Sequence, residues 1–494
     1  MSGGLPLRVA ATISALAGAS LLPPLGLALA DGDAAVSRAF ALPLAAALAA
    51  WSAARFLLRP RDGARRAGAA PNAADAIAAV GAVWVGVSLF GALPLWLSGA
   101  LPTFTDAAFE SASGFTTTGA TVLSDVESLP RAVNFWRCET HWLGGMGVIA
   151  LVVALVPLLG IGGFRLMSAE SSGPEKGRLT ARITDTAKVL WLLYVGLTAL
   201  QAALLRLCGL GWFDAVCHAF STLGTGGFST RNESLAAFGS PAAEWVCTAF
   251  MLAASLNFGI YYRLLARRGE GVRAATEPRV FAGVFLAATA FVAAALALGP
   301  DGEGAGRAVR LAAFQVSSVL STTGFATADY DLWAPAAKAA LFALLLCGGC
   351  SGSTAGGVKV VRWAVLFKQA GCELRRLVHP RGVYVVRVDG VPVRDGLVAG
   401  VGAFLFAYLA LCGATALAGV LAGLPPWEAL SASLSMVGNV GPAFGSLGPT
   451  DNYGALPAAL KWWYCFAMLA GRLEIYTLLV LAARPFLRFG RAHA

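Results

Sequence analysis

Charged residues are scarce in this sequence. Asp, Glu, Lys and Arg make up 13% of its 494 residues, whereas soluble domains usually carry about 25%. Hydrophobic residues make up 57% of the chain, and the mean hydropathy is +0.69. This balance excludes an ordinary soluble domain and indicates a chain that lies in a lipid bilayer.

The motifs of metal-dependent and serine hydrolases are also missing. The chain has only 4 His, with no HExxH, no GxSxG and no cluster of His and Cys, so neither chemistry has support. The 9 Cys are scattered through apolar sequence, and most are interpreted as small buried hydrophobic residues. Cys347 and Cys350 form a CxxC without the βαβ context of a redox motif. A membrane enzyme that uses this CxxC or a His is the alternative from another class, although His141 and His218 are better explained as polar caps or interface residues than as proton sites.

The net charge of +10 is unevenly distributed, and its distribution argues against nucleic-acid binding. Basic residues crowd some segments, namely 59–66, 176–182, 263–279, 359–394 and 484–491. The segments between them are acidic or neutral, as at 31–33, 124–128, 301–304 and 328–331. This alternation is the positive-inside pattern, which predicts that both termini and the basic segments are cytoplasmic.

Apolar runs that can cross a bilayer as helices, which takes about 20 residues, recur along the chain. The first two, at 9–30 and 36–58, are interpreted as a helical hairpin that is retained, not as a cleaved leader. Further runs follow in pairs, at 75–99 and 135–162, 185–208 and 243–267, 279–299 and 336–368, and 395–422 and 459–483. A Thr- or Gly-rich string separates the members of each pair.

These four strings share a register when they are aligned on one glycine. A serine lies six residues before each glycine, and an acid lies thirteen residues before it in all strings except the third, which has Leu311. The glycines are Gly119, Gly227, Gly324 and Gly441, the serines are Ser113, Ser221, Ser318 and Ser435, and the acids are Asp106, Asp214 and Glu428. Such a register indicates an internal repeat.

The spacing within each string indicates its structure. From acid to serine is about two helical turns, which is too short to span a bilayer and predicts a re-entrant half-helix with its acid at the positive end of the helix dipole. The irregular backbone that follows survives at membrane depth only around protein or a water-filled cavity, where rings of carbonyls can replace the hydration shell of a cation. Extramembrane turns are the alternative for any single string, but four strings in register favour an ion site.

Several stretches resemble the Trk/Ktr/HKT superfamily of cation transporters, and most closely its TrkH type, the bacterial potassium-uptake membrane subunit. The filter strings of that family are similar to "SGFTTTGATVL", "STLGTGGFST", "LSTTGFAT" and "GNVGPAFG" in this chain. Its intramembrane loop is similar to "GGCSGSTAGGVKVVR", and its last helix is similar to "GRLEIYTLLVL". The extra N-terminal hairpin also fits the TrkH type.

The resemblance implies one pore per chain, with a filter that binds potassium. The filter residues would be Thr116, Thr117, Thr118, Gly119, Gly224, Thr225, Gly226, Gly227, Ser321, Thr322, Thr323, Gly324, Gly438, Asn439, Val440 and Gly441. It also implies a homodimer in a bacterial inner membrane, a cytoplasmic TrkA-type nucleotide-binding regulatory subunit, and no organic cofactor in this chain. Two departures loosen the filter chemistry: Gly224 stands where many relatives have a polar residue such as Ser, and Asn439-Val440 stands in place of Thr-Thr. A sodium-permeable or ion-coupled cation symporter on the same scaffold is therefore the alternative.

The segment 347–357 interrupts the span 336–368 with five Gly and several small polar residues. Each Gly costs a helix about 1 kcal/mol relative to Ala, so we predict a broken helix whose irregular piece lies in the pore below the filter and acts as the gate. The residues of this gating loop are Gly348, Gly349, Ser351, Gly352, Ser353, Thr354, Gly356 and Gly357. The alternatives are a small-residue surface for helix packing and a phosphate cradle, which would need a GK[ST] ending and a preceding strand.

Arg472 and Glu474 lie inside the last apolar span, where charges are expensive and usually face a cavity or a partner. The family resemblance places Arg472 in the pore beneath the filter, where its positive charge would lower cation occupancy. The alternative is an ion pair between Arg472 and an acid that only fixes helices together. In the cytoplasmic part, the segment 382–393 alternates around Asp389-Gly390, which predicts a β-hairpin.

Together these observations predict an all-α polytopic membrane protein that is not an enzyme. An N-terminal transmembrane hairpin at 1–66 precedes four helix–re-entrant loop–helix repeats around a pseudo-fourfold axis. The repeats are expected at 67–180, 181–270, 271–380 and 381–494, with the broken helix in the third. The expected function is potassium uptake across the cytoplasmic membrane, driven mainly by the membrane potential, which supplies about 2.3 kcal/mol per charge per 100 mV.

Overall fold

The computed structural model describes residues 17–57, 73–158, 183–265, 275–299, 302–393 and 395–475. The first part of the predicted span 9–30, the basic segments 59–66, 176–182 and 484–491, and the end of the span 459–483 lie outside the described residues. Within the described part the chain is mostly helical, as predicted, and a single two-stranded sheet is the exception to an all-α fold.

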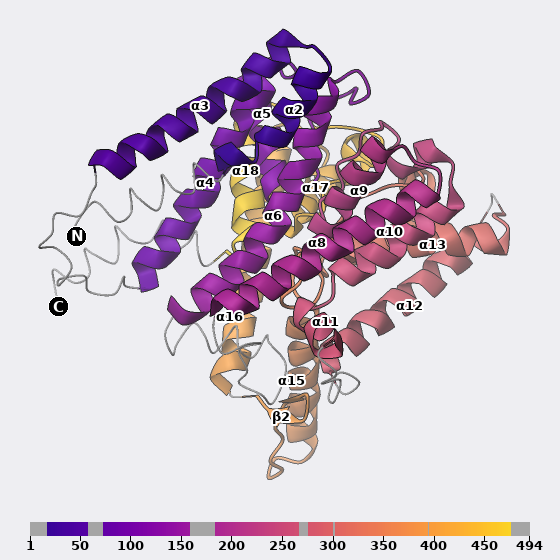
Figure 1. Cartoon of the computed structure of the whole chain (residues 1–494). Coiled ribbons are helices and arrows are strands. Elements are labelled where there is room, and N and C mark those ends of the chain that lie inside the picture. The colour runs from indigo at the N-terminus through magenta and orange to yellow at the C-terminus, as the bar shows by residue number, and fades with distance from the viewer. Residues whose placement is uncertain are drawn as a thin grey trace, which may run out of the picture.

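Five helices of the described part are long and apolar enough to cross a membrane. They are α3 (Ala34–Leu57), α4 (Ala73–Leu97), α8 (Ile183–Leu207), α12 (Thr276–Ala297) and α16 (Asp395–Leu421). α2 (Leu22–Ala30) packs against α3, and this pair lies at one edge of the molecule (Figure 1). These helices support the interpretation of the chain as a membrane protein.

Four shorter helices follow α4, α8, α12 and α16 and pack against them. They are α5 (Phe104–Phe115), α9 (Trp212–Gly224), α13 (Ala305–Leu320) and α17 (Pro426–Gly438). The predicted acids lie in the first turns of α5, α9 and α17, and α13 has none. At the start of α5 the Thr103 hydroxyl also accepts the Asp106 N–H at 3.1 Å, which satisfies a free donor of the first turn. The last turns of these helices are buried, so they end inside the protein.

A second helix follows each short one, but only the first of these is long and continuous. It is α6 (Arg131–Leu158). The predicted span 243–267 is divided into α10 (Pro241–Ala254) and α11 (Phe258–Leu265), and 336–368 into α14 (Pro335–Leu344) and α15 (Val360–Val378). In the span 459–483, α18 (Ala458–Arg472) ends before two residues with left-handed backbone, Glu474 and Ile475, at φ 56° each.

The break in the second span, and the end of α18 at Arg472 in the described part of the fourth, correct the expectation of continuous helices, and each has a physical reason. The α10–α11 break is stabilised by the segment between α14 and α15: the Cys350 N–H donates to the Ser255 carbonyl at 2.8 Å, and the Phe258 N–H donates to the Gly352 carbonyl at 3.2 Å. These bonds replace helical ones that the break removes. At the end of α18, the turned backbone carries Glu474 to Arg362 of α15, with the carboxylate 2.8 Å from the guanidinium.

The β-hairpin predicted within 382–393 is confirmed. β1 (Arg387–Val388) pairs antiparallel with β2 (Val391–Pro392), and Asp389 and Gly390 form the turn at φ 51° and 77°. Two positive φ values are the signature of a tight hairpin turn. The hairpin and α15 project together from one end of the helical body (Figure 1).

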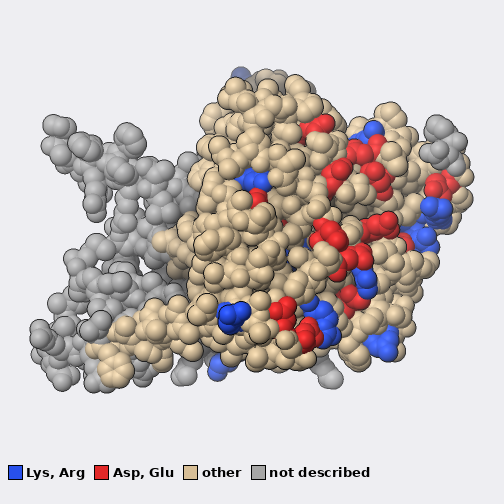
Figure 2. Space-filling model, turned by 90° about the horizontal axis from the view of Figure 1, so that it is seen from above, with Lys and Arg blue, Asp and Glu red and all other residues tan. Residues whose placement is uncertain are grey.

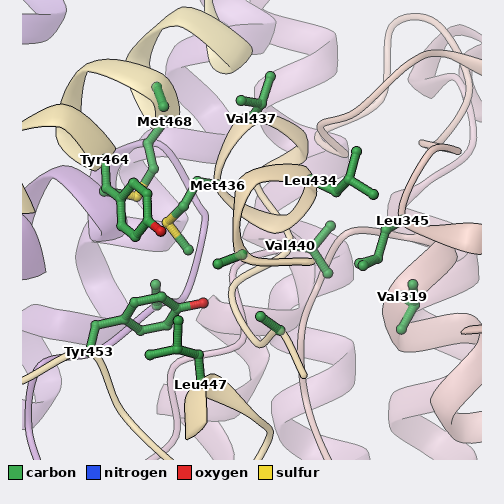
Figure 3. Packing of buried hydrophobic residues seen from close by; sticks show 14 of the residues in the cluster. Val319, Leu345, Leu434, Met436, Val437, Val440, Leu447, Tyr453, Tyr464 and Met468 are labelled. Atoms are coloured by element: carbon green, nitrogen blue, oxygen red, sulfur yellow. The ribbon is translucent and has the colours of Figure 1, made fainter. Parts of the chain in front are cut away.

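The remaining regular elements are short 3-10 helices in the segments that follow the strings: η2 (Ser234–Phe238), η4 (Tyr330–Leu332) and η5 (Gly445–Leu447). The largest buried cluster surrounds the fourth string (Figure 3). There Met436 and Val437 of α17 lie beside Tyr464 and Met468 of α18, with Tyr453 next to them. The fourth string therefore sits in a packed apolar environment rather than in a solvent-exposed turn.

Candidate functional site

The four strings have the same backbone conformation at equivalent positions. The residue two before each glycine has a left-handed backbone, and each glycine itself has a positive φ. The φ values are 55°, 56°, 56° and 56° at Thr117, Thr225, Thr322 and Asn439, and 81°, 82°, 82° and 100° at Gly119, Gly227, Gly324 and Gly441. Threonine is β-branched and rarely adopts this conformation, so each threonine stores about 1–3 kcal/mol of strain that the surrounding structure must support.

One hydrogen bond recurs in every string and supports this conformation. The N–H of the residue before the glycine donates to the carbonyl of the recurrent serine. The pairs are Thr118 to Ser113 at 2.9 Å, Gly226 to Ser221 at 2.8 Å, Thr323 to Ser318 at 2.8 Å and Val440 to Ser435 at 2.9 Å. The serine register therefore marks the point where each helix ends and its last carbonyls accept from the turned backbone.

The four glycines form a closed ring of backbone contacts. A Cβ at Gly119 would collide with the Gly226 carbonyl of the second string, and one at Gly227 would collide with the Thr323 carbonyl of the third. Gly324 meets the Val440 carbonyl in the same way, and Gly441 returns to the Thr118 carbonyl of the first string. Any larger residue at these positions would have to displace the backbone of the next string. Sequence register thus identified residues that the fold brings together.

A cavity of about 110 Å³ opens at this ring. All four ring glycines line it, together with Arg137, Arg231 and Asp451. The upper end of the molecule in Figure 1, seen from above in Figure 2, gathers many acidic side chains. After the first string, the Asp125 carboxylate accepts a hydrogen bond from the amide of Asn232, which follows the second string, and this bond holds the pKa of the carboxyl below its usual value. An ionised carboxylate of this kind attracts cations.

Arg137 of α6 links the first and second strings beside the ring. Its side chain is almost fully buried and pairs with Glu110 of α5 at 2.8 Å. The guanidinium also contacts the Thr121 hydroxyl at 3.4 Å and the Ser229 carbonyl at 3.3 Å, and it lies 4.3 Å from the centre of the Phe228 ring. Sequence reasoning missed this pair, although two charges inside apolar segments were a signal for it.

The other neighbouring strings are linked by different chemistry. Between the second and third, the Leu235 N–H donates to the Ala326 carbonyl at 3.2 Å. Between the third and fourth, the Tyr330 hydroxyl donates to the Ala443 carbonyl at 2.9 Å. Between the fourth and first, the Tyr453 N–H donates to the Thr121 carbonyl at 2.8 Å. We call these links, together with Arg137, the collar of the ring.

The fourth string differs from the others in its side-chain hydrogen bonds. The Asn439 amide nitrogen donates to the Thr118 hydroxyl at 3.0 Å and to the Met468 carbonyl at 2.9 Å. The Tyr453 hydroxyl donates to the Gly441 carbonyl at 2.9 Å. The Tyr453 hydroxyl thus donates to an oxygen of the fourth string, and the Asn439 amide donates to an oxygen of the first string. The other strings have a threonine in place of Asn439, and a threonine has no such amide donor.

The segment 345–359, which contains all the predicted gating-loop residues, lies directly against the third and fourth strings. The Gly356 N–H donates to the Thr322 hydroxyl at 2.7 Å, and a Cβ at Gly356 would meet the Gly438 carbonyl and the Asn439 side chain. On its other side, the Ser351 N–H and hydroxyl donate to Glu277 of α12 at 2.7 and 3.1 Å. The segment is therefore held both by the strings and by the helices around them.

Arg472 lies at the end of α18 and reaches this same segment. Its Nη1 donates to the Thr354 carbonyl at 2.7 Å, and its side chain is buried. The neighbouring acid, Glu474, pairs with Arg362 instead of Arg472. The structure thus places the predicted filter, gating-loop and barrier residues in one continuous contact region.

Comparisons of the sequence and of the structure with known proteins identify the same family. The family model for TrkH, described as a cation transport protein, matches residues 46–281 and 303–486. The chain is 41% identical over 413 residues to the Trk system potassium uptake protein TrkH of Halomonas elongata, covering 82% of this chain and 84% of that protein. It is 38% identical over 408 residues to the protein of the same name from Escherichia coli K12, again covering 82% and 84%. The crystal structure of the potassium transporter TrkH from Vibrio parahaemolyticus superimposes with a TM-score of 0.84 at 32% identity, covering 97% of this chain and 98% of the other.

Proposed function

This chain belongs to the TrkH family of cation transport proteins, and we propose that it takes up potassium across the cytoplasmic membrane of a bacterium through a filter built within one chain. As a member of this family it is a transporter and not an enzyme. The observation that carries the proposal is the closed ring in which Gly119, Gly227, Gly324 and Gly441 each contact the next string. Four equivalent strings around one axis can offer oxygens to one dehydrated ion.

In this proposal the filter consists of residues 116–119, 224–227, 321–324 and 438–441. Backbone carbonyls and threonine hydroxyls replace the water around potassium, and the glycines let neighbouring strings approach closely. The ion is the cargo and moves down the membrane potential, which contributes about 2.3 kcal/mol per charge per 100 mV. The ring contacts favour the four-repeat, pseudo-fourfold organisation with re-entrant short helices, and with repeat boundaries near 67–180, 181–270, 271–380 and 381–494.

Gating and the cationic barrier form the second part of the proposal. The loop 348–357 would close the pore below the filter, which fits its hydrogen bond to Thr322. Arg472 would place a positive charge beside the loop through its bond to the Thr354 carbonyl. A positive charge in a narrow, dry passage raises the energy of a cation there, so this arrangement would limit leakage while the loop is in place.

The proposed assembly is a homodimer that works with a cytoplasmic TrkA-type regulatory subunit. The names of the relatives place those proteins in a Trk system, which supports the view that this chain is also one subunit of a larger system. The projecting α15 and hairpin carry Lys368, Arg375, Arg376 and Arg387. Their positive charge fits the cytoplasmic side of a membrane protein, the side where such a subunit would bind and where both termini are proposed to lie.

Growth of a bacterial strain without its own potassium-uptake systems tests the proposal. Expression of this chain should restore growth at low potassium. Gly227→Ser should not restore growth, because its side chain would collide with the third string. Failure of the wild-type chain, produced in the membrane together with its regulatory subunit, would contradict potassium uptake.

A sodium-permeable or ion-coupled symporter is the second candidate, and the fourth string favours it. Val440 has no hydroxyl, and Asn439 carries an amide where the other strings have a threonine, so this string, unlike the others, offers no hydroxyl oxygen to an ion. Ion flux into proteoliposomes that contain the purified chain distinguishes the two candidates. Potassium flux that is independent of sodium and proton gradients would support a potassium-selective pore. Flux that requires either gradient would support the symporter.

A further inference from the structure

We propose that His141 is a positioning residue of the second filter string, and that the acceptor nitrogen of its imidazole directs the Gly227 carbonyl toward the ion. This inference rests on the proposed function, because it assigns a role in ion selectivity within the proposed filter. His141 lies on α6 and is fully buried. Its Nε2 accepts the backbone N–H of Phe228, the residue after Gly227, at 3.3 Å.

The orientation follows from the planar trans peptide. In a trans peptide the C=O and the N–H point in opposite directions. The Gly227–Phe228 peptide directs its N–H back to the imidazole, so its Gly227 carbonyl points away from His141. Gly227 lines the cavity at the ring. The hydrogen bond therefore keeps an acceptor, rather than a donor, on the side where a cation would pass.

Close packing holds the imidazole in this position. Its ring lies 4.2 Å from the Phe228 ring, measured between centroids. A Cβ on Gly226 would collide with the imidazole, and a Cβ on Gly224 would collide with the backbone of His141. Gly226 thus makes the space that the imidazole fills, and Gly224 lets the backbone of α6 approach the second string. This gives a physical reason for glycine at position 224, where the sequence departs from the family pattern.

The fourth string cannot use a side-chain acceptor of this kind behind its glycine. The residue after Gly441 is Pro442, which has no N–H to donate. There the Gly441 carbonyl accepts from the Tyr453 hydroxyl at 2.9 Å. The peptides at equivalent positions are therefore held by opposite chemistry, by an acceptor behind the second string and by a donor to the fourth.

Matched variants of His141 isolate the acceptor. Gln places its amide oxygen as many bonds from Cα as Nε2, whereas Asn reaches only as far as Nδ1. His141→Gln should therefore keep the potassium-to-sodium flux ratio in proteoliposomes close to that of the wild type. His141→Asn and His141→Ala should lower it about fivefold, equivalent to about 1 kcal/mol, which is the typical net effect of one hydrogen bond.

His218 provides a control for the loss of a buried histidine. It lies on α9, also fully buried, where its Nδ1 donates to the Asp214 carbonyl at 2.7 Å and its Nε2 accepts from the Ser229 hydroxyl at 2.9 Å. In the part of the chain that the structure describes, its ring makes no hydrogen bond to the backbone of residues 224–228. His218→Gln should therefore leave the flux ratio unchanged even if the protein becomes less heat-stable.

The outcomes separate this inference from the proposed function. A wild-type chain without potassium flux would refute the proposed function. Potassium flux in the wild type, with the same flux ratio in His141→Asn and His141→Ala, would refute only the role of His141. Equal loss in His141→Gln and His141→Asn, or failure of both to fold, would also refute it, because the residue would then act through packing and not through its acceptor.

Discussion

Removing only one member of the buried ion pair between Arg137 and Glu110 should destabilise the protein, because the other charge is then left buried without its partner. The two side chains are 2% and 0% exposed, and their charged atoms are 2.8 Å apart. Glu110→Gln leaves the guanidinium buried without a counter-charge, which costs about 3–5 kcal/mol for a buried pair. Arg137→Met should cost less, because Glu110 keeps hydrogen bonds from the Thr121 hydroxyl at 2.9 Å and the Val122 N–H at 3.0 Å.

Replacement of both charges should behave differently from either single change. Apolar residues of similar volume often replace a buried ion pair with little or no loss of stability. Glu110→Gln combined with Arg137→Met removes both charges and keeps an amide oxygen that can accept the Val122 N–H, so this double variant should unfold near the wild-type temperature. The same double variant should lose potassium selectivity, since it removes the collar contacts to Thr121 and Ser229. Stability and selectivity would then be separated in one protein.

Thermal unfolding in detergent and flux in proteoliposomes together test this reasoning. At about 2 °C per kcal/mol, Glu110→Gln should unfold about 6–10 °C below the wild type. An unfolding temperature equal to that of the wild type would refute a desolvated ion pair at this position. A double variant with wild-type selectivity would refute the role of Arg137 in the collar.

Three further changes test other parts of the site. Gly441→Ala should abolish growth rescue because its methyl group would meet the Thr118 carbonyl, whereas Gly423→Ala, at φ 99° but in open space, should retain it; equal rescue would contradict the ring. Thr322→Val removes the acceptor for the Gly356 N–H and should raise basal tracer flux, and Thr322→Ser should not; identical flux in both would show that this bond does not hold the loop. Arg472→Ala should raise ion flux and Arg472→Lys should not, whereas unchanged flux in Arg472→Ala would favour a role in helix packing.

Local sequence signals were enough for several features. The recurrent glycines and serines located the turned backbone of every string, because glycine is the residue best suited to a positive φ and to close approach of another backbone. The first-turn acids Asp106, Asp214 and Glu428 marked the starts of three short helices, and Asp389-Gly390 marked the hairpin turn. These features depend on neighbours in the sequence, so they can be read from it.

Features that depend on distant partners could not be predicted in the same way. The break after Ala254 lies in apolar sequence, and its carbonyl at Ser255 is satisfied by Cys350, almost a hundred residues later. Hydropathy gives no sign of such a partner. The hydrogen bond between Gly356 and Thr322 was unpredictable for the same reason, because neither segment contains a sequence signal that identifies the other as its partner. The four strings and the positions of their turned backbone could thus be located from the sequence, but the contacts that support them could not.

The collar also has an evolutionary consequence. In a pore made of identical subunits, every substitution occurs in all subunits. A change that improves one contact between neighbouring strings, here called a joint, therefore also occurs at every other joint. Here each joint has its own residues: the Arg137 guanidinium at the first, the Leu235 backbone amide at the second, the Tyr330 hydroxyl at the third and the Tyr453 backbone amide at the last. A chain of this design can alter one quarter of the proposed pore at a time, and differences among the quarters become heritable variation on which selection for a different ion can act.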